Sequence, residues 1–327
     1  MRTKLISLII FLLLAIFLSL GFSGYESEFG YKALYDFLFT KLDNDTYNMY
    51  YDIFVLHKAP RIILAVLVGS LLASSGAVVQ SVFLNPLADP YIIGIASAAT
   101  FGAVIAYVLG LNEFFYGIFA FICSVILSII ILFVYRKHQS IATLLILGIA
   151  ISSFLSSFTS LFIYLIGEDS FKITAWLMGY LGSATWFKVS LVFVPTVLCI
   201  SFFYFKRFEL DILLCGDEEA HSLGINVFFS KIVFLLICSV SVAYSVAFCG
   251  MIGFVGLIIP HILRIAFKTS SNVILIPFAS IIGALFLLIS DCFARGLMYP
   301  VEIPIGVITA FFGAPFFIYL ALRRSHA

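Results

Sequence analysis

The stretch Leu213–Val227, LLCGDEEAHSLGINV, is the longest strongly polar segment in a chain otherwise built of apolar runs. Three consecutive acids at 217–219 follow Gly216, where negative charge favours the start of a helix. Gly224 comes just past the expected end of that helix, the position at which glycine commonly closes a helix. The stretch therefore predicts a short, capped helix between two glycines.

This predicted helix carries a small apolar face. Ala220 and Leu223 are three residues apart, so both side chains would lie on one side of the helix. An apolar patch on a polar segment indicates that the helix binds a partner. The alternative interpretation is a solvated linker that happens to be helical. The residues assigned to this element are Gly216, Asp217, Glu218, Glu219, Ala220, His221, Leu223 and Gly224.

Composition places the rest of the chain in a membrane. Of 327 residues, 63% are hydrophobic and 11% are charged, whereas soluble domains carry about 25% charged residues. Apolar runs of roughly 20 residues recur, and each could cross about 30 Å of hydrocarbon as a helix. We therefore predict an all-α, polytopic integral membrane protein. A net charge of +1 gives no indication of a nucleic-acid partner.

The apolar runs predict about ten transmembrane helices in a single transmembrane domain, 1–327. The first could be a signal peptide, but no cleavage-site pattern follows it, so we interpret it as an uncleaved span. An outer loop is expected at 23–60 and a cytoplasmic segment at 207–227. The predicted spans are 4–22, 62–82, 91–110, 114–135, 141–166, 187–205, 228–249, 251–267, 273–294 and 303–322.

Basic residues set the expected orientation, because Lys and Arg are enriched in cytoplasmic loops. With the N-terminus inside, eleven of the 18 Lys and Arg residues fall on the cytoplasmic side, while eleven of the 17 acids fall outside. This distribution predicts that both termini and the Gly216–Gly224 helix are cytoplasmic.

Three further features bear on packing and chemistry. Two prolines in the turn Gln80–Pro90 are expected to make it rigid and cytoplasmic, and the short span 251–267 predicts a broken helix. Gly69, Ala73 and Gly76 offer a close helix-packing face. No phosphate-binding loop, zinc motif or nucleophile motif is present, and the six scattered Cys lack metal-ligand spacing. The sequence thus predicts no enzyme activity, no metal site and no cofactor.

Many short motifs follow one another along these spans. They are Ala59–Arg61, Ser75–Gln80, Asn85–Pro90, Gly94, Gly216–Ala220, Leu223–Gly224, Gly250, Gly253–His261, Arg264, Asp291, Arg295, Glu302, Pro304, Gly306 and Gly313–Pro315. In this order they resemble the permease subunits of ATP-driven (ABC) importers for iron-siderophore complexes, haem and vitamin B12, the iron-chelate uptake permease family. The resemblance covers nearly the whole chain from Ala59 onward. Lys58 departs from it, because many members carry a second Arg there.

The resemblance implies a dimer of permease subunits, two cytoplasmic ATPase subunits that bind the Gly216–Gly224 helix, and a periplasmic or lipoprotein substrate-binding protein outside. Lys58, Arg61 and Arg295 all fall on the outer side and are expected to dock that binding protein. The expected translocation path and inner gate comprise Gly76, Gln80, Asn85, Pro86, Ser140 and Thr143.

The function expected from this resemblance is import of an iron(III)-siderophore across the bacterial inner membrane, the commonest task in the family. Haem and vitamin B12 remain alternatives, and the membrane partner could be a second copy or a close relative. A different class, the ion-coupled secondary transporter, would also carry broken helices, but it usually pairs ionisable residues near mid-membrane. Here Asp291, Arg295 and His261 lie toward span ends.

Overall fold

The computed structural model describes residues 2–22, 29–91, 94–138, 141–298 and 301–324, and this part of the chain is helical throughout, without strands. The predicted all-α class is confirmed. The helices are α1 (Arg2–Gly21), α2 (Tyr31–Phe39), α3 (Asn44–Tyr51), α4 (Ala59–Val82), α5 (Ile95–Val108), α6 (Glu113–His138), α7 (Ile141–Ile166), α8 (Phe171–Leu177), α9 (Trp186–Phe205), α10 (Arg207–Leu213), α11 (Asp217–Ser222), α12 (Val227–Cys249), α13 (Val255–Phe267), α14 (Asn272–Gly296) and α15 (Ile305–Arg324).

Each of the ten predicted spans contains one helix, but not all of these helices are long. Seven helical segments of the described residues are long and apolar enough to cross a membrane, and 95–108, 255–267 and 305–318 are shorter apolar helices. At 1.5 Å per residue, the 13 residues of α13 reach only about 20 Å. The chain is therefore a multi-pass membrane protein, while the number of ten crossings stays a prediction.

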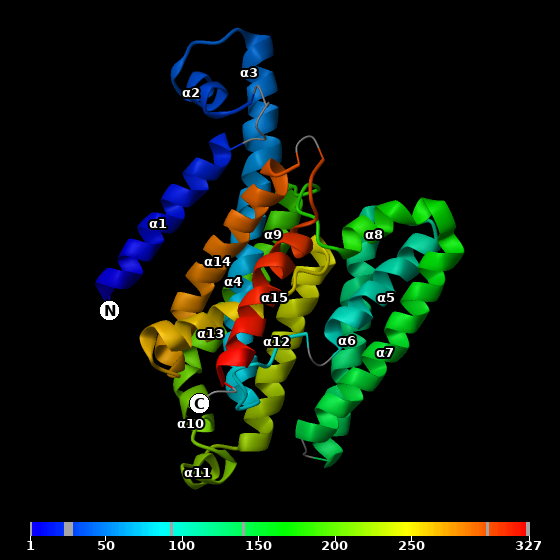
Figure 1. The fold of residues 1–327 in the computed structure, drawn as a ribbon, viewed down its shortest axis with the longest axis vertical. Helices are drawn as coiled ribbons and strands as arrows, with labels where there is room; N and C mark the ends of the chain where they lie inside the picture. Colours follow the sequence, from blue (N-terminus) through cyan, green and yellow to red (C-terminus); the bar gives the residue numbers. More distant parts are fainter. Residues whose placement is uncertain (1, 23–28, 92–93, 139–140, 299–300, 325–327) are drawn as a thin grey trace.

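Residues 29–60, the described part of the expected loop 23–60, are largely helical. Asp43 begins α3 by accepting a hydrogen bond from the Thr46 N–H at 3.1 Å. α3 then continues without a break through a π-helix, Asp52–Lys58, into α4, giving 39 helical residues from Asn44 to Val82. The wider π-turn lets the helix pass Pro60, which has no N–H to donate. α2 and α3 project from one end of the molecule (Figure 1).

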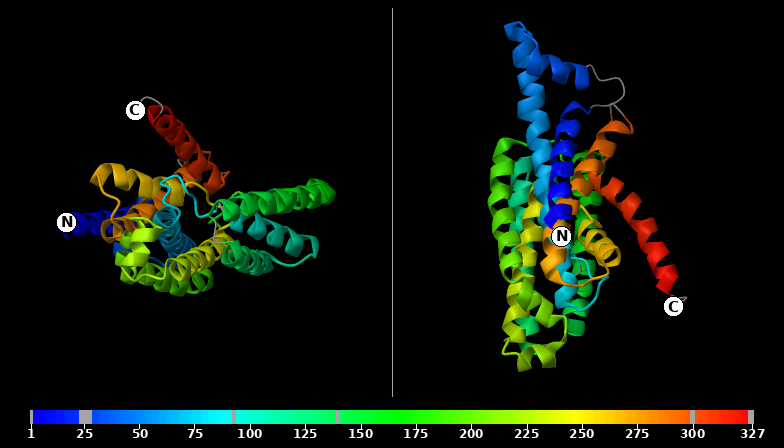
Figure 2. Two further views of the ribbon diagram at one scale, coloured as in Figure 1. Left: turned by 90° about the horizontal axis from the view of Figure 1, so that it is seen from below. Right: turned by 90° about the vertical axis from the view of Figure 1, so that its left-hand side faces the viewer.

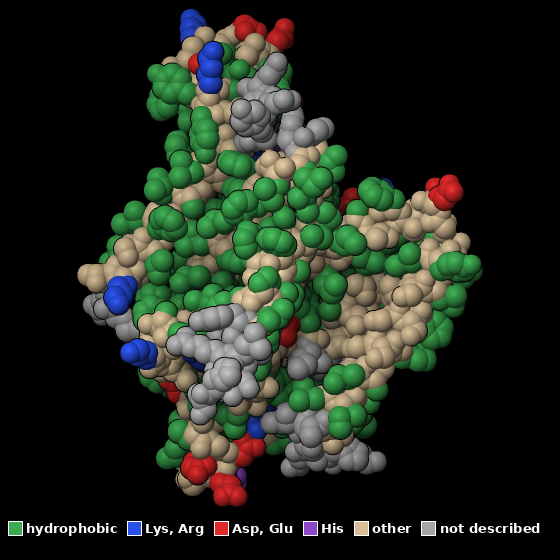
Figure 3. Space-filling view, viewed as in Figure 1, with side chains coloured by type: hydrophobic (Ala, Val, Ile, Leu, Met, Phe, Trp, Pro, Cys, Tyr) green, Lys and Arg blue, Asp and Glu red, His purple; other side chains and the backbone are tan. Residues whose placement is uncertain are grey.

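α4 is the central helix. It packs against α14, α13, α12 and α9, and nearly all of its side chains are buried. α5, α6, α7 and α8 form a second group that reaches the centre mainly through contacts of α6 and α5 with α12, and α1 lies on the opposite side against α14 (Figures 1 and 2). Hydrophobic side chains cover most of the middle of the molecule, and acidic side chains gather mainly toward its ends (Figure 3).

The α4 contacts depend on glycine. A Cβ atom on Gly69 would lie 2.3 Å from the carbonyl oxygen of Gly283 in α14, and one on Gly76 would lie 1.8 Å from the carbonyl oxygen of Gly256 in α13. Both distances are far shorter than a van der Waals contact, so backbone meets backbone at these crossings. Such close approach is how small residues stabilise helix pairs in membranes. The predicted small-residue packing face is confirmed.

We expect Gly69→Ala to push α14 away from α4 and to lower the midpoint of thermal unfolding in detergent, because overpacking a tight contact costs about 1–3 kcal/mol. Gly253→Ala is the matched control, since a Cβ atom at Gly253 would meet nothing within 4 Å. Equal midpoints for the two variants would contradict the close α4–α14 contact.

Candidate functional site

α10 and α11 form the end of the molecule opposite α2 and α3 (Figure 1). α10 lies against the bundle, with Leu210 and Leu213 fully buried. Burial opposes ionisation of its Glu209, but hydrogen bonds from Lys206 and from Ser230 of α12 outweigh this and hold the pKa of Glu209 below its ordinary value. α10, which leads into α11, is thus tied to the end of α9 and to α12.

The predicted short helix is present as α11, and its ends follow from the two glycines. Gly216 has a φ of +115° and begins the helix. At the other end Gly224 has a φ of +84°, its N–H donates to His221 O, and the Ile225 N–H donates to Ala220 O. This pair of hydrogen bonds is the Schellman arrangement, which requires a left-handed residue where the glycine stands.

The predicted apolar face of α11 is wrong in one respect. Ala220 is fully buried within the chain, whereas the Leu223 side chain is 65% exposed. Ala220 packs against the protein, whereas Leu223, the C-cap residue just past the last helical residue, keeps its side chain open to solvent. Leu223 therefore supplies the exposed apolar contact, and Ala220 holds α11 against the protein.

An ion pair fastens α11 to α12. Lys231 Nζ lies 2.6 and 2.7 Å from the two carboxylate oxygens of Asp217. The Lys231 side chain is only 2% exposed, while that of Asp217 is 56% exposed. A buried ammonium group needs a counterion, so Asp217 holds the first turn of α11 over the start of α12.

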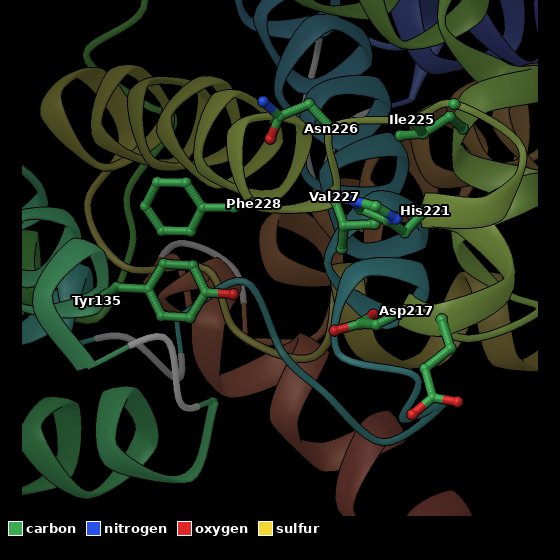
Figure 4. Close-up of a pocket in the computed structure, with 9 residues that line it drawn as sticks. Tyr135, Asp217, His221, Ile225, Asn226, Val227 and Phe228 are labelled. Atoms are coloured by element: carbon green, nitrogen blue, oxygen red, sulfur yellow. The ribbon is translucent and has the colours of Figure 1, made fainter.

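A pocket of about 750 Å³ lies beside this ion pair, between α11 and the end of α6. Tyr135 of α6 stacks on Phe228 of α12 with ring centroids 5.8 Å apart. Figure 4 shows these two rings on one side of the pocket, with Asp217 and His221 across from them. Sequence reasoning missed Lys231 and Tyr135. A lysine four residues inside a predicted span was a signal for the first, but no pattern marked the second.

The predicted docking residues do not form a free basic cluster. Arg61 donates to Asp291 at 2.9 Å and to both oxygens of Glu302 at 2.8 and 3.0 Å. Arg295 pairs with Asp291 at 3.0 Å and donates to Ser19 Oγ at 2.9 Å. Both arginines are thus engaged within the chain, and Asp291 between them is fully buried. The expectation that they are presented on the surface is wrong.

Lys58 is also held inside the chain. Its Nζ donates to the carbonyl oxygens of Leu20 at 3.1 Å and of Phe29 at 2.8 Å. These bonds connect the end of α1 and the start of the α2 segment to the π-helix before α4. A docking role for the three cations stays a prediction, and it would require some of these contacts to be exchanged.

The residues predicted for the path lie in two different settings. Gly76 and Gln80 are buried inside the subunit, where Gln80 Nε2 donates to the carbonyl oxygens of Gly256 and Leu257 and Gln80 Oε1 accepts from Arg264. They join α4 to α13 and do not line an open path in this structure, because the glycine-mediated crossing leaves no space there. Thr143 is half-buried near the start of α7, and Ser140 lies outside the described residues.

The turn after α4 is held by its own side chains. Asn85 Oδ1 accepts from the Leu87 N–H at 3.0 Å, and Asp89 Oδ1 accepts from the Tyr91 N–H at 2.7 Å. Asn85 is exposed and Pro86 is half-buried. Ala88 is buried, so the turn packs back against the protein at this residue.

Among the described residues, no group of three or more His, Cys, Asp or Glu could hold a metal ion. The long apolar helices, with the tethered surface helix α11 at one end, define a multi-pass membrane protein.

Comparison with known proteins then identifies the family. Residues 10–323 match the model of the FecCD transport family, and the chain belongs to it. It is 36% identical to the hemin transport system permease HmuU of Yersinia pestis, over 87% of each chain. It is 35% identical to the vitamin B12 import system permease BtuC of Salmonella newport, over 82% of this chain and 83% of that one.

Solved structures agree with this assignment. An inward-facing metal-chelate type ABC transporter superposes with a TM-score of 0.87 at 30% identity, covering 99% of this chain and 100% of the other. PsaBC from Streptococcus pneumoniae shares the fold with a TM-score of 0.55 at 20% identity, covering 79% of this chain and 88% of the other. The chain is a permease subunit of an ABC importer and not an enzyme, since ATP hydrolysis belongs to separate subunits.

We expect Asp291→Asn to destabilise the fold strongly, because it leaves two buried arginines without the carboxylate that they share. Breaking a buried ion pair costs about 3–5 kcal/mol, which would appear as a lower midpoint of thermal unfolding in detergent. Glu302→Gln is the control, since Glu302 is 35% exposed and pairs with Arg61 but not with Arg295. If both variants melted together with the unaltered protein, the Asp291 network would have no stabilising role.

Proposed function

We propose that this chain forms one half of the membrane channel of an ATP-driven importer and that its cargo is an iron(III)-siderophore complex. The chain would act as a dimer, with a second copy or a close relative, in the bacterial inner membrane. Cytoplasmic ATPase subunits would bind at α11, and a substrate-binding protein would dock at the α2–α3 end. The observation that carries the proposal is α11, which presents the exposed Leu223 while ties to α12 hold its backbone.

A membrane topology follows from this proposal. The seven long helices and the three shorter apolar helices would together give ten spans. The first residues of α1 and the last residues of α15 lie nearer to the α10–α11 end than to the α2–α3 end (Figure 1). Both termini would then be cytoplasmic, as the distribution of Lys and Arg predicts.

Two features favour a force-transmitting role for α11 and argue against a simple linker between two spans. A solvated linker needs neither a buried lysine at its base nor a buried alanine on its inner face, and α11 has both. Exposed Leu223 and the acids at 217–219 would fit a partner surface with an apolar pocket and basic residues around it.

The choice of cargo is supported by chemistry that the similar proteins share. Haem, vitamin B12 and the metal chelate named for the solved structure are all metal ions wrapped in a large organic ligand. An iron(III)-siderophore belongs to the same class, and it remains our proposal among these cargoes.

Leu223→Asp should prevent assembly with the ATPase. The substitution buries a charge in an apolar contact, and we expect the affinity of the purified permease for its ATPase to fall at least about tenfold, or about 1.4 kcal/mol. Leu109→Asp is the matched control. Leu109 is also exposed, at 61%, but it lies just before the start of α6. The other end of α6, which carries Tyr135, is the end beside α11. Full affinity in Leu223→Asp would return α11 to the role of a linker.

Uptake into proteoliposomes tests the cargo and the energy source. The permease with its ATPase and binding protein should accumulate a ⁵⁵Fe-loaded siderophore when ATP is enclosed with the ATPase, and should not do so with a non-hydrolysable analogue. Preferential uptake of haemin or cyanocobalamin would replace the siderophore by that cargo. Uptake driven by an ion gradient without ATP would instead identify a secondary transporter.

A further inference from the structure

Asp211 of α10 joins three helices at the α11 end of the molecule. Its Oδ2 accepts a hydrogen bond from Ser271 Oγ at 2.6 Å, and its Oδ1 accepts one from the Asn272 N–H at 2.5 Å. Ser271 and Asn272 are the N-cap and the first residue of α14. Asn272 Oδ1 in turn accepts from Ser81 Oγ, in the last turn of α4, at 3.0 Å.

The start of α14 is thereby capped by a different helix. The first N–H groups of a helix need an acceptor, which the N-cap side chain usually supplies. Ser271 makes no such bond to its own helix, and the carboxylate of Asp211, some 60 residues earlier in the chain, takes that place. A carboxylate also suits the positive end of the helix dipole. The cap therefore ties α10 to α14 and stabilises α14 at the same time.

α10 in turn leads directly into α11. Only Leu214, Cys215 and Gly216 separate them, and hydrogen bonds from the last two N–H groups to Ile212 O and Leu213 O close this joint. Leu210 and Leu213 hold the inner face of α10 against the bundle. Displacement of α11 would therefore reach α10 within three residues, and Asp211 is the polar contact through which α10 meets α14.

The line of contacts continues into the centre of the molecule. Gln80 directly precedes Ser81 in α4. Its side-chain amide donates to the backbone of α13, and its side-chain oxygen accepts a hydrogen bond from Arg264. The Asp217–Lys231 pair connects α11 to α12 separately. α11 is thus attached directly to α12, and through α10 it is attached to α12 by the Glu209–Ser230 hydrogen bond and to α14 and α4 by Asp211.

We propose that Asp211 is a positioning residue that passes movement of α11 to α14 and α4. The inference rests on the proposed function, in which α11 receives the ATPase, and it adds the route by which the membrane helices follow. Both carboxylate oxygens of Asp211 are used inside the chain. Its loss should therefore weaken the link between ATP hydrolysis and the opposite side of the membrane without preventing assembly.

The test uses the complete complex of permease, ATPase and cognate substrate-binding protein in lipid nanodiscs. The readout is the factor by which the binding protein stimulates ATP hydrolysis, since this signal must cross the permease. For Asp211→Ala we expect this factor to fall by at least about fivefold, the lower end of common coupling strengths, with basal hydrolysis and assembly unchanged. Asp211→Asn should keep most of the stimulation, because its amide oxygen can still accept from Asn272 N–H.

Asn226→Ala is the matched control. Asn226 Oδ1 caps α12 by accepting from the Phe229 N–H at 3.1 Å, so this variant also removes a helix cap at the α11 end, but one that lies within a single helix. It should keep normal stimulation. If Asp211→Ala does not fold, Ser271→Ala removes only one of the two bonds to Asp211 and should lower the stimulation less.

Normal stimulation in both Asp211→Ala and Ser271→Ala would overturn the proposal. An equal loss in Asn226→Ala would also overturn it, because the effect would then be general destabilisation of this end. Failure of the proposed function is a separate result: Leu223→Asp would leave ATPase binding intact, whatever Asp211→Ala does to the stimulation.

Discussion

The structure depends on contact of helix backbone with helix backbone along α4. Lipid chains are as apolar as the side chains, so the hydrophobic effect does not drive one membrane helix onto another. The helices associate instead through close packing and polar contacts. Gly69 and Gly283, and Gly76 and Gly256, let α4 approach α14 and α13 until no Cβ would fit between them. Because α4 also packs against α12 and α9, every central helix is positioned by this one, and movement of α14 relative to α4 would have to slide along a tight contact.

Polar groups in this protein are concentrated where such helices end. At the α2–α3 end, Asp291 is shared by Arg61 and Arg295, which connects α4 and α14 beyond their glycine crossing. At the other end, Asp211 and Ser81 meet at the start of α14. The same pair of helices is thus joined at both ends by hydrogen bonds and in the middle by packing. Contacts at both ends and in the middle oppose relative movement of the two helices.

α11 differs from the core helices because it has one side packed against the protein and an exposed apolar residue, Leu223, at its end. Its Ala220 and Asp217 are used inward, on the protein and on buried Lys231. Leu223, the C-cap residue of α11, is exposed. The short helix is therefore fixed on one side, while Leu223 at its end stays available to a partner.

Much of this was determined by the sequence alone. Apolar runs located the ten apolar helices, since a chain in hydrocarbon must satisfy its backbone groups within each span, but they did not predict α2 and α3. Gly216 and Gly224 marked α11 because both positions have a positive φ. The pairing of side chains was decided only by the tertiary structure. Whether Arg61 and Arg295 are free or share Asp291, and whether Ala220 faces outward or inward, depends on which helices lie side by side. Asp211 reads as one acid in a polar segment, and its role at α14 appears only when residues 60 positions apart meet, because contacts between distant helices leave no periodic pattern in the chain.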